Sequence, residues 1–259
     1  MDVEVTVGYI DESGQVYYIV HNDENVEALY QRDCSWWRGR TNGRGPKVIQ
    51  QVIDQQTPDY DSDPKRELGA ALNAIVQNKL RKTGKNRLSL LEIGCANGPT
   101  VRHLNKHFPD LKLSFYGFEL TGVLVKDFRR WFPQHSVIQG GVEEMLTKDI
   151  STFPHSPYDL FVASGTLCMV KPDLVPEVLL KASLLTDRFV FWDYLENRAG
   201  RISKDRPVMF QLKGPTHMLY ANPFEPLLKK IGFKVEHLEL TPRQSRTHGA
   251  LTGVIVAGR

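Results

Sequence analysis

Cysteine is scarce in this chain, and the three cysteines are Cys34, Cys95 and Cys168. They form no even set for disulfide pairing and have no metal-ligand spacing, which excludes a disulfide framework and a cysteine zinc site. Long apolar runs are also absent, since no segment reaches the roughly 18 residues of a transmembrane helix. The first residues lack the pattern of a signal peptide. We therefore expect a soluble, cytoplasmic protein with no membrane partner.

Neither sign of charge dominates. The 259 residues include 33 Lys and Arg against 30 Asp and Glu, so the formal net charge is +3. This small excess does not predict nucleic-acid binding, which usually requires a strongly basic domain. Apolar residues make up 41% of the chain, enough for the packed core of one large domain or of one domain with an extension. The oligomeric state stays open, with a homodimer as one option.

What the sequence does contain is an apolar strand that leads into a glycine turn and a helix start. Residues 88–93 are mostly apolar and Gly94 follows at once, which predicts a buried parallel strand with a sharp turn. Gly98 and Pro99 mark the start of a helix, because proline is tolerated in the first helical turn. We expect free backbone N–H groups in this turn, where a nucleotide cofactor can approach.

The residues of the turn distinguish between cofactors. The dinucleotide fingerprint G-x-G-x-x-G is not met, because Ala96 and Pro99 occupy its second and third glycine positions. Glu92, at the carboxyl end of the strand, is poorly placed for a pyrophosphate but suits a cation. Residues 112–120 predict the next strand, and Glu119 near its end can accept hydrogen bonds from both ribose hydroxyls of a nucleoside.

The pattern E-x-G-x-x-x-G, followed by this second carboxylate, resembles the class I S-adenosylmethionine-dependent methyltransferases. The resemblance extends over residues 88–259 and implies S-adenosyl-L-methionine as the cofactor. It also implies an α/β fold with a Rossmann-like, open, mostly parallel seven-stranded sheet, helices on both faces and the strand order 3-2-1-4-5-7-6. The cofactor-binding residues that it implies are Glu92, Gly94, Cys95, Ala96, Asn97, Gly98, Glu119, Leu120, Gly141, Val142, Glu143, Ser164 and Gly165.

Two groups of these positions follow later strands. Residues 137–145 match the family's third strand and the loop that lies against the adenine. Many members have Asp where this chain has Gly141, which leaves Glu143 or a backbone carbonyl to recognise the adenine amino group. Residues 158–167 match the fourth strand, where Ser164 and Gly165 would line the methyl pocket.

Periodicity and turn residues predict the remaining elements. They are a helix over 172–185, a strand over 188–192 with its exit at 193–194, a helix that a capping box at Asn222 opens and Gly232 ends, and strands over 233–240 and 251–257. By resemblance, the last two strands form an antiparallel pair at the sheet edge.

Residues 1–87 form an N-terminal extension outside the core resemblance. Strands over 3–10 and 15–20 and an amphipathic helix from 63–64 to Gly84 are predicted there. Between them, Trp36 and Trp37 lie among three arginines, and arginine stacks on aromatic faces. This run either covers the cofactor site or anchors the extension to the core.

The acceptor site is predicted from the long segment 194–221, which is rich in Arg and Lys and should attract a small acidic molecule. The candidate substrate-binding residues are Trp36, Trp37, Arg38, Tyr194, Arg198 and Tyr220. The candidate general bases are His217, Asp193 and His248, because transfer to oxygen needs a proton acceptor. No metal is expected, since no His, Asp and Glu cluster is evident in the sequence.

The resulting hypothesis is direct transfer of the methyl group of S-adenosylmethionine to an O, N or C nucleophile of a small molecule. Three alternatives remain. One is a non-catalytic S-adenosylmethionine-binding or scaffold protein, and another is a protein or nucleic-acid methyltransferase, although the chain lacks an Asn-Pro-Pro-Tyr tetrad at 163–166. The last is a nicotinamide dehydrogenase.

Overall fold

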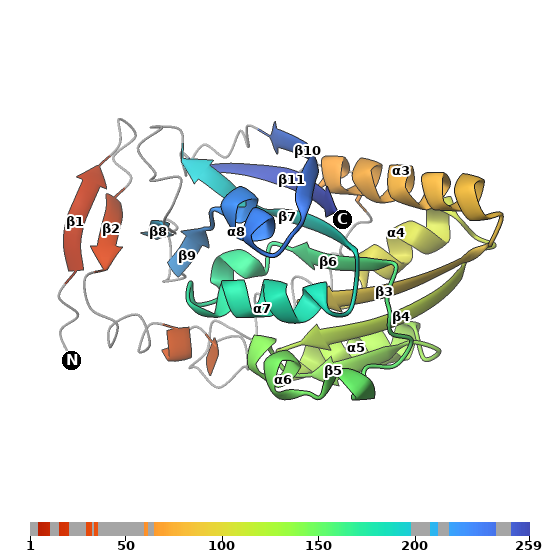
Figure 1. Cartoon of the computed structure of the whole chain (residues 1–259). Coiled ribbons are helices and arrows are strands. Elements are labelled where there is room, and N and C mark those ends of the chain that lie inside the picture. The colour runs from red at the N-terminus through yellow and green to blue at the C-terminus, as the bar shows by residue number, and fades with distance from the viewer. Residues whose placement is uncertain are drawn as a thin grey trace.

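The computed structural model describes residues 5–10, 16–20, 30–32, 34–35, 60–61, 65–197, 208–211, 218–241 and 250–259. A seven-stranded sheet forms the centre of the molecule (Figure 1). Its strands are β3 (Arg87–Ile93), β4 (Lys112–Glu119), β5 (Ser136–Gln139), β6 (Leu160–Ser164), β7 (Arg188–Asn197), β10 (Lys234–Thr241) and β11 (Ala250–Gly258).

The strand order confirms the expected topology. The sheet runs β10-β11-β7-β6-β3-β4-β5, which is 3-2-1-4-5-7-6 read from the other edge and numbered from β3. The five neighbouring strands β5, β4, β3, β6 and β7 are parallel to one another, whereas β11 is antiparallel to both β7 and β10. The chain therefore leaves β3 toward β4 on one side and returns to β6 on the other, which opens a crevice at the carboxyl ends of these strands.

Helices cover both faces of the sheet. One face carries α3 (Arg66–Thr83), α4 (Pro99–His107) and α5 (Gly122–Trp131); the other carries α6 (Val142–Thr147), α7 (Leu174–Ser183) and α8 (Phe224–Lys230). Short 3₁₀ helices η1 (Ile150–Thr152) and η2 (Leu167–Met169) follow α6 and β6. Because successive side chains of a strand alternate between faces, Leu90 packs with the first group and Leu91 with the second.

The segment between β7 and α8 contains strands that the sequence did not predict. β7 continues to Asn197, and Asp193 pairs with Gly253 of β11 instead of leaving the sheet. Farther along, β8 (Val208–Gln211) and β9 (Met218–Ala221) form a two-stranded antiparallel sheet. The predicted end of β7 was wrong because the ladder with β11, a partner from far along the chain, extends this strand.

The predicted capping box at Asn222 was also wrong. The helix α8 begins at Phe224, and no side chain caps it. Instead, the buried side chain of Asn222 donates from Nδ2 to the carbonyl oxygen of Leu167 at 3.1 Å. Asn222 therefore attaches the start of α8 to η2, which lies beside the crevice.

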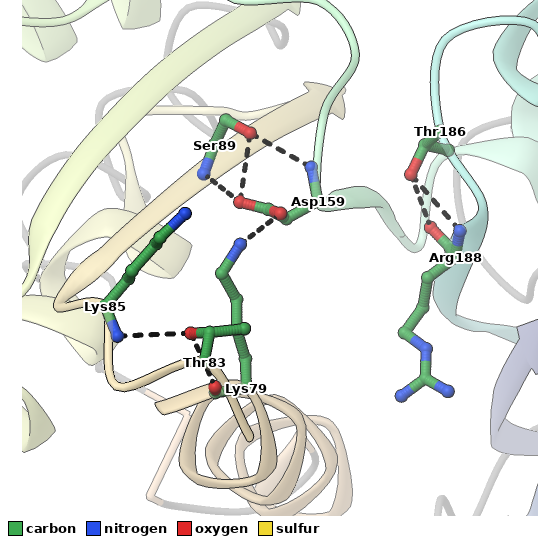
Figure 2. A network of polar contacts seen from close by, with 7 residues as sticks. All are labelled: Lys79, Thr83, Lys85, Ser89, Asp159, Thr186 and Arg188. Carbon is green, nitrogen blue, oxygen red and sulfur yellow. Dashed lines mark hydrogen bonds and ion pairs between the residues drawn. The ribbon is translucent and has the colours of Figure 1, made fainter. Parts of the chain in front are cut away.

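The helix α3 shows the predicted apolar stripe and ends at the predicted residue. Gly84 adopts the left-handed conformation and its N–H donates to the Leu80 carbonyl oxygen at 2.9 Å. Figure 2 shows how the C-terminal half of α3 joins the sheet: Asp159 forms an ion pair with Lys79 and accepts hydrogen bonds from Ser89 N at 2.8 Å and Ser89 Oγ at 3.1 Å. Asp159 therefore links α3, β3 and the start of β6.

The N-terminal part contributes a separate two-stranded antiparallel sheet of β1 (Val5–Ile10) and β2 (Val16–Val20), with β2 beside β8 (Figure 1). Among the residues that the structure describes, no helix is both long enough and apolar enough to cross a membrane.

Candidate functional site

A cavity of about 310 Å³ lies at the carboxyl ends of β3, β4 and β6. Its floor is formed by the residues with which these strands end or by those that follow directly, namely Gly94, Ala96, Glu119, Leu120, Ser164 and Gly165. The start of α6 adds Gly141, Val142 and Glu143. Nine of the thirteen cofactor residues predicted from the resemblance therefore line one cavity.

The glycine turn after β3 is shaped by its neighbours. Gly94 has φ +67°, and a Cβ atom there would lie 2.0 Å from Thr166 Oγ1, so only glycine fits. The expected free N–H groups were wrong for three positions. Gly94 N and Cys95 N donate to Phe118 O at 2.8 and 3.2 Å, and Gly98 N donates to Cys95 O at 3.0 Å. The turn therefore uses these amides to hold itself against β4.

Glu119 lies at the edge of the cavity with a fixed carboxylate. Its Oε2 accepts from Ala96 N at 2.9 Å and its Oε1 from Thr121 N at 2.8 Å. Burial raises the pKa of this carboxyl, and the two backbone hydrogen bonds oppose that shift. Because each carboxylate oxygen has a second lone pair, Glu119 can still accept two hydroxyl donors from a ligand.

Glu92 lies behind the cavity wall instead of lining it. It is 1% exposed and accepts a hydrogen bond from Thr100 Oγ1 at 2.7 Å through Oε1, whereas Oε2 has no hydrogen-bond partner among the described residues. The hydroxyl group of Thr100 also lies 2.9 Å from that of Tyr60. Burial raises the pKa of Glu92 to about 8. A cation near Glu92 would favour its charged form.

The side chains of the other three predicted cofactor residues are turned elsewhere. Cys95 is fully buried toward Gly117 of β4, and burial raises the pKa of its thiol well above the usual value. The Asn97 side chain donates to Asp127 on α5 at 3.0 Å. Gly98 packs so closely on Phe132 that a Cβ atom would lie 2.7 Å from its ring. These residues shape the turn from behind.

The start of α6 separates two neighbouring glutamates. Glu144 Oε2 accepts from Gly141 N at 2.6 Å and so caps the helix. Glu143 remains at the cavity, where Tyr30 OH donates to its Oε1 at 2.5 Å. The pKa of Tyr30 is raised, mainly by burial and to a smaller extent by this hydrogen bond.

Residues before α3 contribute to the cavity wall, and most of them were missed from the sequence. They are Tyr30, Cys34, Tyr60 and Lys65. The ammonium group of Lys65 lies 5.1 Å from the centre of the Trp192 ring and 5.6 Å from that of Tyr60. The only sequence signal was the aromatic and arginine-rich run that includes Tyr30; nothing local marked Tyr60 or Lys65.

Most of the predicted acceptor and base residues are not in the described parts of the chain. Trp36, Trp37, Arg38, Arg198, His217 and His248 lie outside the described residues. Tyr194 and Tyr220 are buried, at 6% and 4% exposure, and neither lines the cavity.

Asp193 is fully buried and also does not line the cavity. Its Oδ2 accepts from Cys168 N at 3.1 Å and its Oδ1 from Tyr194 N at 2.8 Å. Burial raises the pKa of this carboxyl to about 6. Asp193 therefore holds η2 against β7. Its carboxylate does not reach the cavity, where proton transfer would take place.

No protein-family model and no curated protein sequence matches this chain. Solved structures do match it along most of its length. A magnesium protoporphyrin IX methyltransferase from Synechocystis PCC 6803, with bound S-adenosylhomocysteine, is 13% identical, with a TM-score of 0.56, and the match covers 88% of this chain and 99% of that one. A 1,6-didemethyltoxoflavin-N1-methyltransferase from Burkholderia thailandensis is 15% identical, with a TM-score of 0.56 and coverage of 97% of both chains.

A third matching structure is that of a protein named for a different reaction. The [4+2]-cyclase SpnF is 12% identical, with a TM-score of 0.54, and the match covers 78% of this chain and 85% of that one. Since likeness at such identities concerns the fold, the function has to be argued from the site. The strand order and these matches show that the chain has the fold of the class I S-adenosylmethionine-dependent methyltransferases.

Proposed function

We propose that this protein is an S-adenosylmethionine-dependent methyltransferase that acts on a small, acidic molecule. The observation that carries the proposal is the carboxylate of Glu119. It ends β4 at the cavity, beside the turn after β3, and backbone N–H groups of Ala96 and Thr121 orient it. This arrangement suits the two ribose hydroxyls of a nucleoside cofactor.

Glu92 supports a cofactor that is cationic. Its Oε2 is buried without a hydrogen-bond partner among the described residues, and its pKa is raised because burial outweighs the nearby charge of Lys65, so a further positive charge would stabilise the anion. A pyrophosphate would add negative charge at this place, whereas an ammonium or sulfonium group would add a positive charge to that of Lys65. Glu92 and the turn therefore favour S-adenosylmethionine over a nicotinamide dinucleotide.

We also propose that the extension of residues 1–87 covers the cofactor site. Tyr30, Cys34, Tyr60 and Lys65 supply part of the cavity wall, and Tyr30 reaches Glu143 at the start of α6 through a 2.5 Å hydrogen bond. A wall built in this way excludes water from the reacting groups. Trp36 and Trp37 would extend it.

The reaction needs little chemistry from the protein. When bound, S-adenosylmethionine supplies a methyl group on a positively charged sulfur, which is already activated for attack. The chain's own task is to orient the acceptor beside Ser164 and Gly165 and to keep water out. Transfer to O, N or C remains open at this site.

One side chain at the cavity suggests an acidic acceptor. Lys65 is the basic residue among the described residues that line the cavity, which also include Glu119 and Glu143, and a carboxylate or phosphate could pair with it. The segment 198–206 adds arginines and a lysine farther along the chain. For an oxygen acceptor we propose His217 as the general base, with His248 as the second candidate, because Asp193 lies buried behind η2.

A second candidate function is cofactor binding without methyl transfer. The observation that favours it is the likeness to the [4+2]-cyclase SpnF, a protein of this fold named for another reaction. In this case Glu119 would still bind S-adenosylmethionine, with Glu92 behind the cavity wall, but no methyl group would leave the cofactor.

The first experiment is isothermal titration calorimetry of S-adenosylhomocysteine against the wild type and Glu119→Ala. We expect saturable binding that weakens by about 1–3 kcal/mol, roughly 5- to 150-fold, the range for hydrogen bonds to a charged group. The matched control is Glu225→Ala, which removes an exposed carboxylate on α8 and should leave the affinity unchanged. Circular dichroism checks that each variant is folded.

The outcomes separate the hypotheses. If the folded wild type does not bind S-adenosylhomocysteine, the methyltransferase proposal fails, and NADH is the next ligand to titrate. If Glu119→Ala binds as tightly as Glu225→Ala, the site has been assigned wrongly. If binding occurs but no S-adenosylhomocysteine forms from S-adenosylmethionine with a panel of small carboxylic acids, amines and phosphates, the second candidate is favoured.

A further inference from the structure

Two histidines and an aspartate meet beside α4, outside the group of residues that lines the cavity. His103 and His107 are one helical turn apart, so their side chains share a face of α4, and their ring centres are 4.5 Å apart. Asp61 comes from the segment before α3. Its Oδ1 lies 2.7 Å from His107 Nε2 and 3.6 Å from His103 Nδ1.

The three side chains offer ligand atoms that a single metal ion can hold. One atom of each residue lies within 4.8 Å of the other two. In a tetrahedral zinc site, with bonds of about 2.0–2.2 Å, neighbouring ligand atoms are roughly 3.3–3.5 Å apart. The two distances from Asp61 Oδ1 fall on either side of this value, so small side-chain movements would suffice. We propose that Asp61, His103 and His107 bind a divalent transition-metal ion, with Zn²⁺ as the expected ion.

The surroundings of His103 support this inference. Its ring is fully buried, and its Nε2 lies 3.0 Å from Asn73 Oδ1 on α3. Because an amide oxygen only accepts, Nε2 carries the proton in this arrangement, and Nδ1 faces the Asp61 carboxylate. Either a proton on Nδ1 or a metal ion between the two atoms would satisfy this pair. A histidine that donates its second N–H to an acceptor behind it is also the usual arrangement at metal sites.

The two oxygens of Asp61 have different neighbours. Oδ2 lies 2.5 Å from the ammonium group of Lys106, whereas Oδ1 faces the two histidines. Lys106 thus pairs with one oxygen, and the other faces the two imidazoles that would share the metal with it. The competing explanation is an ion-pair cluster of Asp61 with Lys106 and with protonated His103 and His107, which would bind no metal.

The location suggests an effect on the cofactor site. Asp61 directly follows Tyr60, which lines the cavity and contacts Thr100 of α4 at 2.9 Å. A metal bridge from Asp61 to α4 would hold Tyr60 in the cavity wall from a second side. We expect Zn²⁺ to tighten S-adenosylhomocysteine binding. This coupling rests on the proposed function, whereas metal binding itself does not.

The test uses the full-length protein without an affinity tag, treated with EDTA and desalted. It is titrated with Co²⁺, followed by its visible absorption, and with Zn²⁺, followed by calorimetry. We expect one ion per chain, binding at least tenfold more weakly in Asp61→Ala and in His107→Ala, and roughly 10- to 100-fold more weakly in Asn73→Ala. The control is His237→Ala, which removes a histidine whose side chain is 52% exposed on β10 and should bind like the wild type.

Asp61 and His107 are exposed or half-buried, so their variants should fold even if a change at buried His103 does not. Absence of stoichiometric Co²⁺ and Zn²⁺ binding by the wild type would overturn the proposal in favour of the ion-pair cluster. Equal affinity in Asp61→Ala, His107→Ala and His237→Ala would overturn it as well. The wild type could also bind one Zn²⁺ that Asp61→Ala and His107→Ala do not bind, and yet fail to bind S-adenosylhomocysteine. This result would support the metal site and refute only the proposed function.

Discussion

Replacing Glu92 by glutamine should change how stability depends on pH. The carboxyl has a pKa of about 8 in the folded protein against 4.5 without the fold, because burial disfavours its charged form. Below pH 4.5 it is protonated in both states and there is no penalty. As pH rises from 4.5 to about 8, the unfolded chain releases a proton that the folded protein keeps, so the free energy of unfolding falls. Above this range the whole penalty is present.

The size of the effect follows from the same two values. One pH unit corresponds to about 1.4 kcal/mol, so the gap between 4.5 and about 8 gives an upper limit of about 5 kcal/mol. The amide of the substituted side chain cannot ionise, but it keeps an acceptor for the Thr100 hydroxyl. We therefore expect Glu92→Gln to become more stable than the wild type as pH rises, by up to about 4 kcal/mol between about pH 5 and pH 8.

The assay is urea denaturation of both proteins at about pH 5, 6.5 and 8, without cofactor. Subtracting one profile from the other removes the contributions of other buried carboxyls, such as Glu119 and Asp193, which both proteins share. Glu225→Gln, at an exposed position on α8, is the control and should follow the wild type at every pH. Parallel pH profiles for the wild type and Glu92→Gln would refute the argument that burial of Glu92 outweighs the hydrogen bond from Thr100 and the charge of Lys65.

Three further changes test other parts of the structure. Asp159→Ala should lower the free energy of unfolding by about 1–3 kcal/mol in a denaturant titration, since it leaves a β3 backbone donor without its acceptor; no loss would contradict the contacts in Figure 2. Gly94→Ala should abolish cofactor binding measured by calorimetry, because its Cβ would lie 2.0 Å from Thr166 Oγ1, and Thr166→Gly in the same chain should restore part of it. Wild-type affinity in Gly94→Ala would contradict the turn geometry. Tyr30→Phe should weaken S-adenosylhomocysteine binding several-fold through loss of its 2.5 Å contact with Glu143, and an unchanged affinity would count against the covering role of the extension.

Strand order and the cofactor end of the sheet were accessible before the structure. The stripe of α3, the helix stop at Gly84 and the turn after β3 depend on residues within a few positions of one another. Glu119 could be placed because it ends a strand parallel to β3, and parallel strands bring their carboxyl ends to one edge. The order of the strands itself came from the family resemblance, since spacing carries no information about it.

Predictions were wrong where a polar group forms a hydrogen bond with a residue that is distant in the sequence. Asn222 has the local pattern of a helix cap, yet its side chain donates to Leu167, a carbonyl 55 positions away. The amides of the glycine turn look free in the sequence, but the Phe118 carbonyl of β4 accepts from two of them. In each case, a buried polar group took the partner that the fold offered, because leaving it unpaired in the core is unfavourable.

By itself, the sequence determined the alternation of strands and helices, the glycine turn and the two carboxylates at the strand ends, because these follow from local periodicity and backbone sterics. Tertiary structure alone decided which residues enclose the site. Tyr30 reaches Glu143 across 113 positions, and Asp61 reaches His107 across 46. The spacing of His103 and His107 was visible in the chain, but only folding of the segment before α3 onto α4 supplies their third partner. Such contacts form when separate elements bury their apolar faces together, and that pairing is not encoded within either element.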